Sequence, residues 1–492
     1  MYRLIPILLI TVTLFSASAQ RMTTALSTNP QTLDPQLTFE GFSFAVTNQL
    51  YETLVRISAE GEIVPGLATA WSSPAPNQLE LTLREGVTFH DGTPLNAEAV
   101  KRSLERLLAT ETAAPGRFVV SAIESVTAPD AQTVLIETAA PFAPLLAHLA
   151  HPVTAIVQAE AAASLAREPV GTGPFRFASW QDNTEVVLQA NPEYWGGAPE
   201  IAEVVYRIIP DVSTQLVELR AGGLDLVFNV PVDTYAELAN TPELTATSFL
   251  GWGSAHLGFN VVNPKLQDVR VRQALSHAID KQLIVEAFFQ GLAEPAIVPL
   301  PPTVRFAAEL EEVYPYDPER ARELLSEAGA EGLSLRLDIY QDASIEATAQ
   351  ILQAMLAEVG VTLEIRVQEY PAYVEAAQQD SLELYMTSWG TVTLDADYTL
   401  YAFFHSSEIP QNNLSRYSDP EVDASLEAGR ETLDTTERQE LYTQVQEQVL
   451  QDAPMLTLYY PYSTYVKGNR LEGERVAFSF INLDLRDASL ND

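Results

Sequence analysis

Strand-like and helix-like patterns alternate along almost the whole chain, and this alternation constrains the fold more than any other feature. Residues 79–83 alternate apolar and polar side chains, which is the pattern of a strand with one buried face. After a turn at 91–94, Asn96 precedes a segment whose apolar residues recur at helical spacing, so we expect Asn96 to cap a helix. Interleaved strands and helices of this kind predict an α/β fold.

Further elements follow the same two patterns. We expect strands at 185–188, 203–209 and 362–367, and helices at 269–289, 318–328, 344–359 and 435–450. Gly329 and Gly360 lie directly after two of these helices, where glycine commonly ends a helix. A length of 492 residues indicates more than one domain, yet no single long linker separates them.

The N-terminus carries the pattern of a secretory signal peptide. Arg3 gives a basic start, residues 4–15 are mostly apolar, and Ala17 and Ala19 form a small-x-small pattern. We expect cleavage after Ala19, so that Gln20 becomes the mature N-terminus. The alternative is a membrane anchor, but the apolar run is shorter than the about 20 residues that span a bilayer. No later segment is apolar for long enough, so we expect no direct membrane insertion.

Composition narrows the compartment and the chemistry. The chain contains no cysteine, which excludes disulfides, thiolate metal sites, cysteine nucleophiles and a lipid-anchoring cysteine after the signal peptide. A secreted protein without a tether is expected in the periplasm. The formal net charge is -38, so the protein should not bind nucleic acid or anionic lipid. This charge either favours a cationic ligand or serves solubility and salt tolerance.

Familiar catalytic motifs are missing from the sequence. There is no Walker A segment, no His-Glu-x-x-His and no Gly-x-Ser-x-Gly. In the glycine-rich segment that ends at Pro174, the proline lacks the N–H that a phosphate cradle needs, so a turn is expected. His148 and His151 have no acidic residue nearby in the sequence that would complete a metal site, and Asp395 and Asp397 are too close together to flank a glycosidic bond. We therefore expect a non-enzymatic protein without a cofactor or metal.

Trp252 and Trp389 lie beside glycine, at 251–253 and at 389–390, in segments that resemble exposed turns. Tryptophan offers a flat apolar surface, and a neighbouring glycine leaves the backbone bare. A cleft that holds an extended ligand uses both. These segments are therefore candidate ligand contacts, with ordinary core packing as the alternative.

Ordered blocks of sequence occur at intervals along the chain. They are Thr-Leu-Asp-Pro at 32–35, Tyr-Glu-Thr-Leu-Val at 51–55, Pro-Gly-Leu-Ala at 65–68, the long block 83–100, Gly-Thr-Gly-Pro-Phe at 171–175, Asn-Pro-Glu-Tyr-Trp at 191–195, and the blocks 258–260, 269–275, 278–280, 316–318 and 324–329. Together they resemble the peptide/nickel class of bacterial extracellular solute-binding proteins. This class serves ATP-driven (ABC) importers and includes dipeptide-, oligopeptide- and glutathione-binding members. The resemblance covers nearly the whole mature chain.

The resemblance implies the two-lobe, hinged fold of type II periplasmic binding proteins. Lobe I would comprise 20–49, 170–253 and 468–492, an extra domain would be inserted at 50–169, and lobe II would comprise 254–467. A ligand between the lobes would stabilise the closed form, which the permease subunits of the importer recognise. The implied function is capture and delivery of a short peptide or peptide-like amine by a monomer.

The resemblance also implies which residues bind the ligand. In peptide-binding members, an aspartate six residues after the tryptophan of the loop 388–398 pairs with the ligand's α-ammonium group, which indicates Asp395. Asp397 is the second candidate, or it caps the helix expected at 398–404. The full ligand-binding set is Asp395, Trp389, Gly390, Thr391, Asp397, Trp252, Thr38 and Phe39.

The chain departs from the dipeptide binders at one position. Those proteins carry an arginine before the helix expected at 344–359, where it holds the ligand carboxylate, but residues 340–343 contain none. We therefore expect an amine contact without a matching carboxylate contact. Open alternatives are a nickel or other metal chelate with His405 as a contact, another small solute, ligand sensing without transport, and an enzyme on this scaffold.

Overall fold

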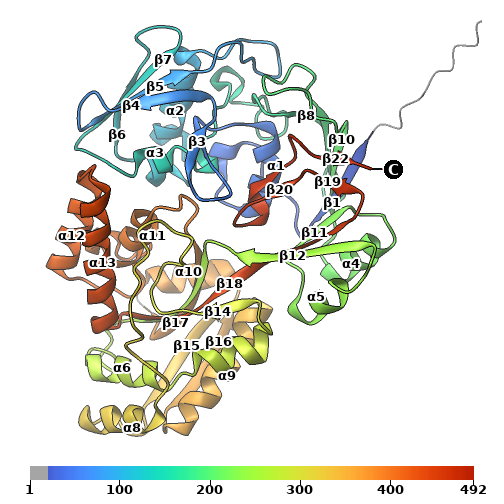
Figure 1. Ribbon diagram of the computed structural model, residues 1–492. Coiled ribbons are helices and arrows are strands. Elements are labelled where there is room, and N and C mark those ends of the chain that lie inside the picture. Colours follow the sequence, from blue (N-terminus) through green and yellow to red (C-terminus); the bar gives the residue numbers. More distant parts are fainter. Residues whose placement is uncertain (1–19, 380, 492) are drawn as a thin grey trace, which may run out of the picture.

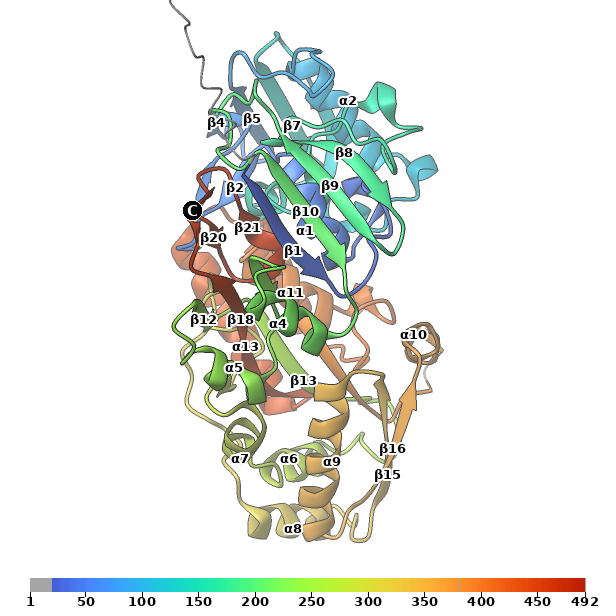
Figure 2. The ribbon, with the colours of Figure 1, turned by 90° about the vertical axis from the view of Figure 1, so that its right-hand side faces the viewer.

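The computed structural model describes residues 20–379 and 381–491, so the predicted signal peptide lies outside the described residues. Two α/β lobes lie one above the other and are joined by extended strands (Figure 1). A side view shows the strands β1, β10, β9 and β8 next to one another in the upper lobe, with β15 and β16 in the lower lobe (Figure 2). The predicted α/β class and two-lobe architecture are confirmed.

The upper lobe is built on a mixed sheet with the order β8-β9-β10-β1-β11. Its strands are β1 (Arg21–Leu26), β8 (Phe175–Gln181), β9 (Glu185–Ala190), β10 (Glu203–Ile208) and β11 (Leu226–Phe228). Strand β1 pairs in parallel with β10 and β11, and Met22, Val204 and Tyr206 are buried in the core. The helices are α1 (Gly41–Leu50), α4 (Val212–Arg220) and α5 (Val232–Leu238).

A separate antiparallel sheet lies within residues 50–169, the segment that the resemblance assigns to an inserted domain, and we use that name for this segment below. Its order is β4 (Ala68–Ser72), β5 (Gln78–Leu83), β7 (Thr133–Thr138) and β6 (Ile123–Thr127). Helix α2 (Ala97–Leu108) packs on it, and the Asn96 side chain accepts a hydrogen bond from the Ala99 N–H at 2.9 Å, as the sequence predicted. The hairpin β2 (Val55–Ile57) and β3 (Ile63–Pro65) and the short helix α3 (Leu145–His148) complete this part.

The lower lobe contains a second mixed sheet with the order β16-β15-β17-β13-β18. Its strands are β13 (Gly253–Phe259), β15 (Ser334–Tyr340), β16 (Thr362–Gln368), β17 (Leu384–Gly390) and the first part of β18 (Met455–Gly468). The helices are α6 (Val269–His277), α7 (Lys281–Ile284), α8 (Pro318–Glu327), α9 (Ala343–Glu358), α10 (Tyr370–Gln378), α11 (Ala396–Phe404), α12 (Pro420–Glu431) and α13 (Thr435–Asp452). Helices α11, α12 and α13 lie below the inserted domain, on the same side of the molecule (Figure 1).

The lobes are joined where strands leave one sheet and enter the other. Strand β12 (Leu244–Leu250) belongs to the upper sheet and is followed directly by β13 of the lower sheet. Strand β18 pairs with β14 (Ala293–Pro295) as far as Pro461, and with β12 from Tyr462 onward. The chain therefore changes lobes inside β18, before the expected boundary after residue 467. The division into two lobes stays a proposal, with the boundary in β18 moved to between Pro461 and Tyr462.

One predicted helix differs from the structure. The segment expected to be helical at 269–289 is divided into α6, α7 and a π-helical turn (Val285–Phe289). The division occurs because the Asp280 side chain accepts a hydrogen bond from the Leu283 N–H at 2.9 Å and caps a new helix. Gly329 and Gly360 adopt positive φ angles of 65° and 83°, which confirms them as helix stops. Within the described residues, no helix combines the length and apolar character needed to cross a bilayer.

Candidate ligand-binding site between the lobes

The predicted loop lies between the end of β17 and the start of α11. Gly390 pairs with Gly253 across the β13–β17 ladder, and the Thr391 N–H donates to the Trp252 carbonyl at 3.1 Å. A Cβ atom on Gly390 would lie 2.9 Å from the Trp252 indole nitrogen, so glycine lets the ring pack directly on the strand. The structure thus brings Trp252, Trp389, Gly390 and Thr391 together at the crossover between the lobes.

The two tryptophans are less exposed than their glycine neighbours suggested. Trp252 is only 7% exposed because its ring stacks on Phe478 at 5.9 Å, so it is a packed residue and not an exposed turn residue. Trp389 is half-buried within β17 and contacts Tyr398 and Phe403. Its indole N–H is buried and has no hydrogen-bond partner in the described part of the chain. A ligand carbonyl would satisfy this donor.

The second edge of β17 is largely unpaired. On one side, β13 pairs with β17 along its whole length from Leu384 to Gly390. On the other side, β15 pairs only with Leu384 and Tyr385. Among the described residues, 387–390 therefore have no strand partner on that side, and Ser388 is exposed. We call residues 387–390 on this side the β17 edge.

The upper lobe reaches the same region through an aromatic stack. The Phe39 ring, 38% exposed, stacks on His151 at 5.2 Å, and His151 in turn lies 5.9 Å from the Tyr398 ring of α11. Thr38 is buried, and its hydroxyl accepts a hydrogen bond from the Glu40 N–H at 3.1 Å. Of the two predicted upper-lobe residues, Phe39 therefore presents its side chain at the interface, whereas the Thr38 hydroxyl is engaged within its own loop.

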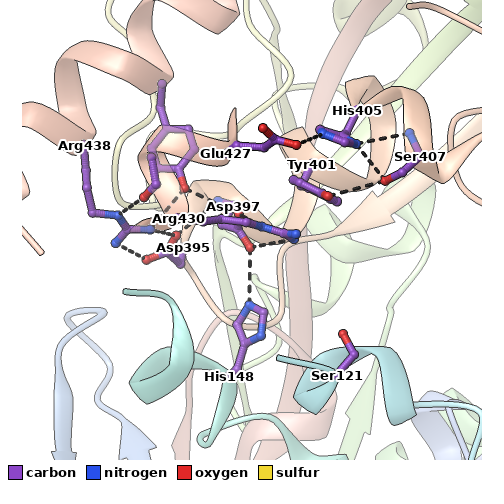
Figure 3. Close-up of polar contacts among 12 residues, drawn as sticks. Ser121, His148, Asp395, Asp397, Tyr401, His405, Ser407, Glu427, Arg430 and Arg438 are labelled. Atoms are coloured by element: carbon purple, nitrogen blue, oxygen red, sulfur yellow. Dashed lines mark hydrogen bonds and ion pairs between the residues drawn. The ribbon is translucent and has the colours of Figure 1, made fainter. Parts of the chain in front are cut away.

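Asp395 is engaged by an arginine from α13. Its carboxylate is 2% exposed and accepts two hydrogen bonds from Arg438, at 2.8 and 2.9 Å (Figure 3). It also accepts the Asp397 N–H at 3.1 Å and so caps α11. The alternative in which Asp397 is the cap is wrong, because the helix begins two residues earlier than expected. The contact of Asp395 with a ligand ammonium group stays a prediction, and it would require Arg438 to share or release the carboxylate.

Asp397 is fully buried and paired with Arg430 of α12. The guanidinium donates to both carboxylate oxygens, at 2.6 and 3.2 Å. His148 of the inserted domain approaches from the opposite side, with its Nε2 3.7 Å from the Asp397 Oδ2 (Figure 3). The Ala143 N–H also donates to the Arg430 carbonyl at 2.7 Å. The inserted domain therefore contacts the lower lobe directly.

Sequence patterns did not reveal either arginine. Arg430 and Arg438 lie 33 and 43 residues after the aspartates that they bind, on separate helices. One signal was present in the sequence: cations are scarce in this acidic chain, and any carboxylate that becomes buried needs one, because an unpaired buried charge is costly. Between 412 and 452 the only basic residues are Arg416, Arg430 and Arg438.

Two cavities adjoin this interface. The larger, about 420 Å³, lies between α1, the β2–β3 hairpin and the C-terminal segment, and Val392 lines it from the lower lobe. Burial raises the pKa of Asp484 in its wall to about 6. The smaller, about 220 Å³, lies between the inserted domain and α11, and His148, Asp397 and Arg430 line it.

Metal ligands do not gather in the described residues. No group of three or more histidine, aspartate or glutamate side chains there is placed to hold a metal ion. His405 stacks on Tyr401 at 4.1 Å, with its Nε2 3.4 Å from Glu427 (Figure 3). In the stretch where dipeptide binders carry arginine, Asp342 caps α9 through the Ser344 and Ile345 N–H groups.

Comparisons with known proteins agree with this architecture. The family model described as bacterial extracellular solute-binding proteins, family 5 middle, matches residues 62–411. The chain is 29% identical over 488 residues to the glutathione-binding protein GsiB of Salmonella typhimurium, covering 95% of each chain. Among solved structures, the periplasmic binding protein DppA from Helicobacter pylori in complex with the peptide STSA has a TM-score of 0.85 at 28% identity, covering 96% of this chain and 98% of that one. HbpA2 from Haemophilus parasuis has a TM-score of 0.84 at 28% identity, covering 96% and 100%.

Proposed function

This chain belongs to family 5 of the bacterial extracellular solute-binding proteins, and from that premise we propose that it captures a short peptide between its lobes in the periplasm. It then delivers the peptide to the permease subunits of an ATP-driven importer. The protein acts as a monomer and performs no chemistry on the ligand. The relatives named for glutathione and for a bound peptide support a peptide-like ligand.

The observation that carries the peptide proposal is the β17 edge. A strand edge without a partner presents backbone N–H and C=O groups in a row, and an extended peptide satisfies them by adding as a further strand. The buried Trp389 N–H offers one more donor beside this edge. Phe39 of the upper lobe supplies an apolar surface at the same interface.

Backbone and aromatic contacts are expected to dominate the affinity. The two buried aspartates are already neutralised by Arg430 and Arg438, so neither provides an isolated charge for the ligand. No arginine stands at 340–343 to hold a carboxylate. We keep the contact between Asp395 and a ligand ammonium group as a proposal that depends on rearrangement of Arg438.

Binding couples to closure because the ligand contacts both lobes. A ligand that touches the β17 edge below and the Phe39 loop above binds the closed form better than an open form, and it shifts the population by that difference in affinity. The permease subunits then recognise a conformation of the protein that depends on bound ligand.

The test uses the mature protein and ligands that differ in class. Thermal shift and calorimetry are measured with short peptides, sugars and nickel chelates, and native mass spectrometry weighs any ligand that co-purifies. Peptides are expected to raise the melting temperature. If only sugars or metal chelates did so, the peptide proposal would be wrong.

Strand addition has its own test within the peptide class. A peptide N-methylated at alternate residues cannot donate along one edge, so one methylation pattern is expected to lose affinity at least about tenfold and the other to lose little. Trp389→Phe removes the indole N–H while keeping an aromatic ring. Trp180→Phe is its control, because the Trp180 N–H instead bonds Asn29 in the upper lobe. Equal binding by both methylated forms would exclude strand addition.

A further inference from the structure

The smaller cavity is not explained by strand addition at the β17 edge. It lies between the inserted domain and helices α11 and α12, and its lining includes Phe118, Phe142, His148, Asp397, Tyr398 and Arg430. We call it the His148 pocket. At about 220 Å³ it holds about seven waters' worth of liquid volume, which is enough for one side chain.

The hydrogen bonding of His148 fixes which ring nitrogen is the donor and which is the acceptor. Its Nδ1 lies 2.7 Å from the Val119 carbonyl oxygen, which can only accept, so Nδ1 carries the hydrogen. Burial lowers the pKa of His148 although Asp397 opposes this effect, and the ring is therefore neutral at pH 7. The Nε2 atom is then a lone-pair acceptor. It is buried and has no hydrogen-bond partner in the described residues.

A second acceptor faces this nitrogen. The Asp397 Oδ2 lies 3.7 Å from Nε2, and no hydrogen is available between them while the imidazole is neutral. Two acceptors at this separation repel each other unless a donor bridges them. A nitrogen placed about 2.9 Å from each would see them at an angle of about 80°, close enough to the angle between two N–H bonds for both hydrogen bonds to form.

The surroundings favour a cationic donor over an anion. The aspartate and Arg430 neutralise each other, and Glu408 adds a negative charge to the lining. The Phe118, Phe142, Tyr398 and Tyr401 rings line the pocket, and aromatic faces attract cations. Arg430 already lies over the Tyr401 ring at 3.0 Å and the Phe142 ring at 5.5 Å, so Phe118 and Tyr398 are the rings left for a ligand cation.

We propose that the His148 pocket is a ligand subsite for a nitrogen that carries at least two hydrogens, preferably a primary ammonium group, with His148 Nε2 and Asp397 Oδ2 as its acceptors. This inference rests on the proposed function where the ammonium group belongs to a side chain of the bound peptide. The inserted domain then selects ligands by their side chains, a role separate from the strand contacts of the lobes. A free amine is the other source of the same chemistry.

The test compares two variants of His148, each of which replaces a different one of its two ring nitrogens. In His148→Asn the side-chain NH2 takes the place of Nδ1 and keeps the donor to Val119, but no acceptor stands at Nε2. In His148→Gln the side-chain oxygen takes the place of Nε2. Ser121→Ala is the matched control, because Ser121 lines the pocket but its hydroxyl donates to the Phe118 carbonyl.

Calorimetry measures peptide pairs that differ only in lysine against norleucine at one position. The lysine peptide is expected to bind about tenfold tighter in the unmodified protein, in His148→Gln and in Ser121→Ala, and equally tightly in His148→Asn. A lysine preference that persists in His148→Asn, or that is absent from the unmodified protein at every position, overturns the proposal.

A free-amine arm distinguishes this proposal from the proposed function. Butylammonium alone is expected to raise the melting temperature of the unmodified protein but not of His148→Asn, whereas tetramethylammonium, which has no N–H, is expected to have no effect. If no peptide bound, the proposed function would fail, and the butylammonium result would still decide the subsite. The subsite proposal would be refuted if both cations raised the melting temperature equally. It would also be refuted if butylammonium left the melting temperature unchanged and no lysine preference was found.

Discussion

Removing the negative charge of Asp395 tests whether this residue stabilises the folded protein or binds the ligand. In Asp395→Asn the Arg438 guanidinium, whose side chain is 5% exposed, loses a carboxylate that accepts two of its hydrogen bonds. Its bonds to the Gly429 carbonyl and the Tyr442 hydroxyl remain, but neither partner carries a compensating charge. Breaking a buried pair by removing one partner costs about 3–5 kcal/mol. Asparagine still caps a helix, so the loss comes from the charge pair and not from the cap.

The assay is urea unfolding of the mature protein, with peptide affinity measured on the folded variant. Asp395→Asn is expected to lose about 3–5 kcal/mol, and the double variant with Arg438→Met is expected to recover much of it, because the uncompensated charge is gone. The control is Asp487→Asn, since its partner Arg475 is 66% exposed and such pairs contribute about 0–1 kcal/mol. A loss below about 1 kcal/mol for Asp395→Asn, together with a large loss of peptide affinity, would refute this reasoning and support the ammonium contact.

Three further predictions follow from single residues. Burial lowers the pKa of His256 to about 3, so this side chain stays neutral in the folded protein, whereas it gains a proton in the unfolded protein below about pH 6.5. Its contribution to stability is therefore complete above that pH and is lost as the pH falls. The difference in unfolding free energy between the unmodified protein and His256→Gln should shrink by about 2 kcal/mol from pH 7.5 to pH 5. A gap independent of pH would contradict this. Gly258→Ala places a Cβ atom 2.0 Å from the Tyr385 ring and should cost about 1–3 kcal/mol in urea unfolding, whereas Gly468→Ala, with open space around it, should cost less. Equal costs would show that the contact relaxes freely. Intact mass of the secreted protein should place its N-terminus at Gln20, and any other start would correct the predicted cleavage after Ala19.

Many elements of the fold could be predicted from the sequence because they depend on interactions between residues close together in the chain. Asn96 caps α2, and Gly329 and Gly360 stop α8 and α9, because each acts on backbone groups a few residues away. The break at Asp280 is also local, but the helical spacing of apolar residues continues across it and concealed the cap. The α/β class follows from such local periods, and it needed no knowledge of distant contacts.

Only part of the candidate site could be predicted from the sequence. The loop around Trp389 was found because its residue types and spacing resemble those of a family. The sequence did not show that Trp252 would be buried by Phe478, because those residues meet only after β12, β13 and the C-terminal segment have packed together.

The sequence by itself determined the alternation of strands and helices, the helix caps and the family to which the chain belongs. Tertiary structure alone decided what the two aspartates of the loop do. Their charges are matched by arginines 33 and 43 residues away, and a histidine of the inserted domain faces one of them across the interface. A carboxylate in a sequence is a charge without a partner; only the packing of α11 against α12 and α13 removes it from water and determines which cation must accompany it.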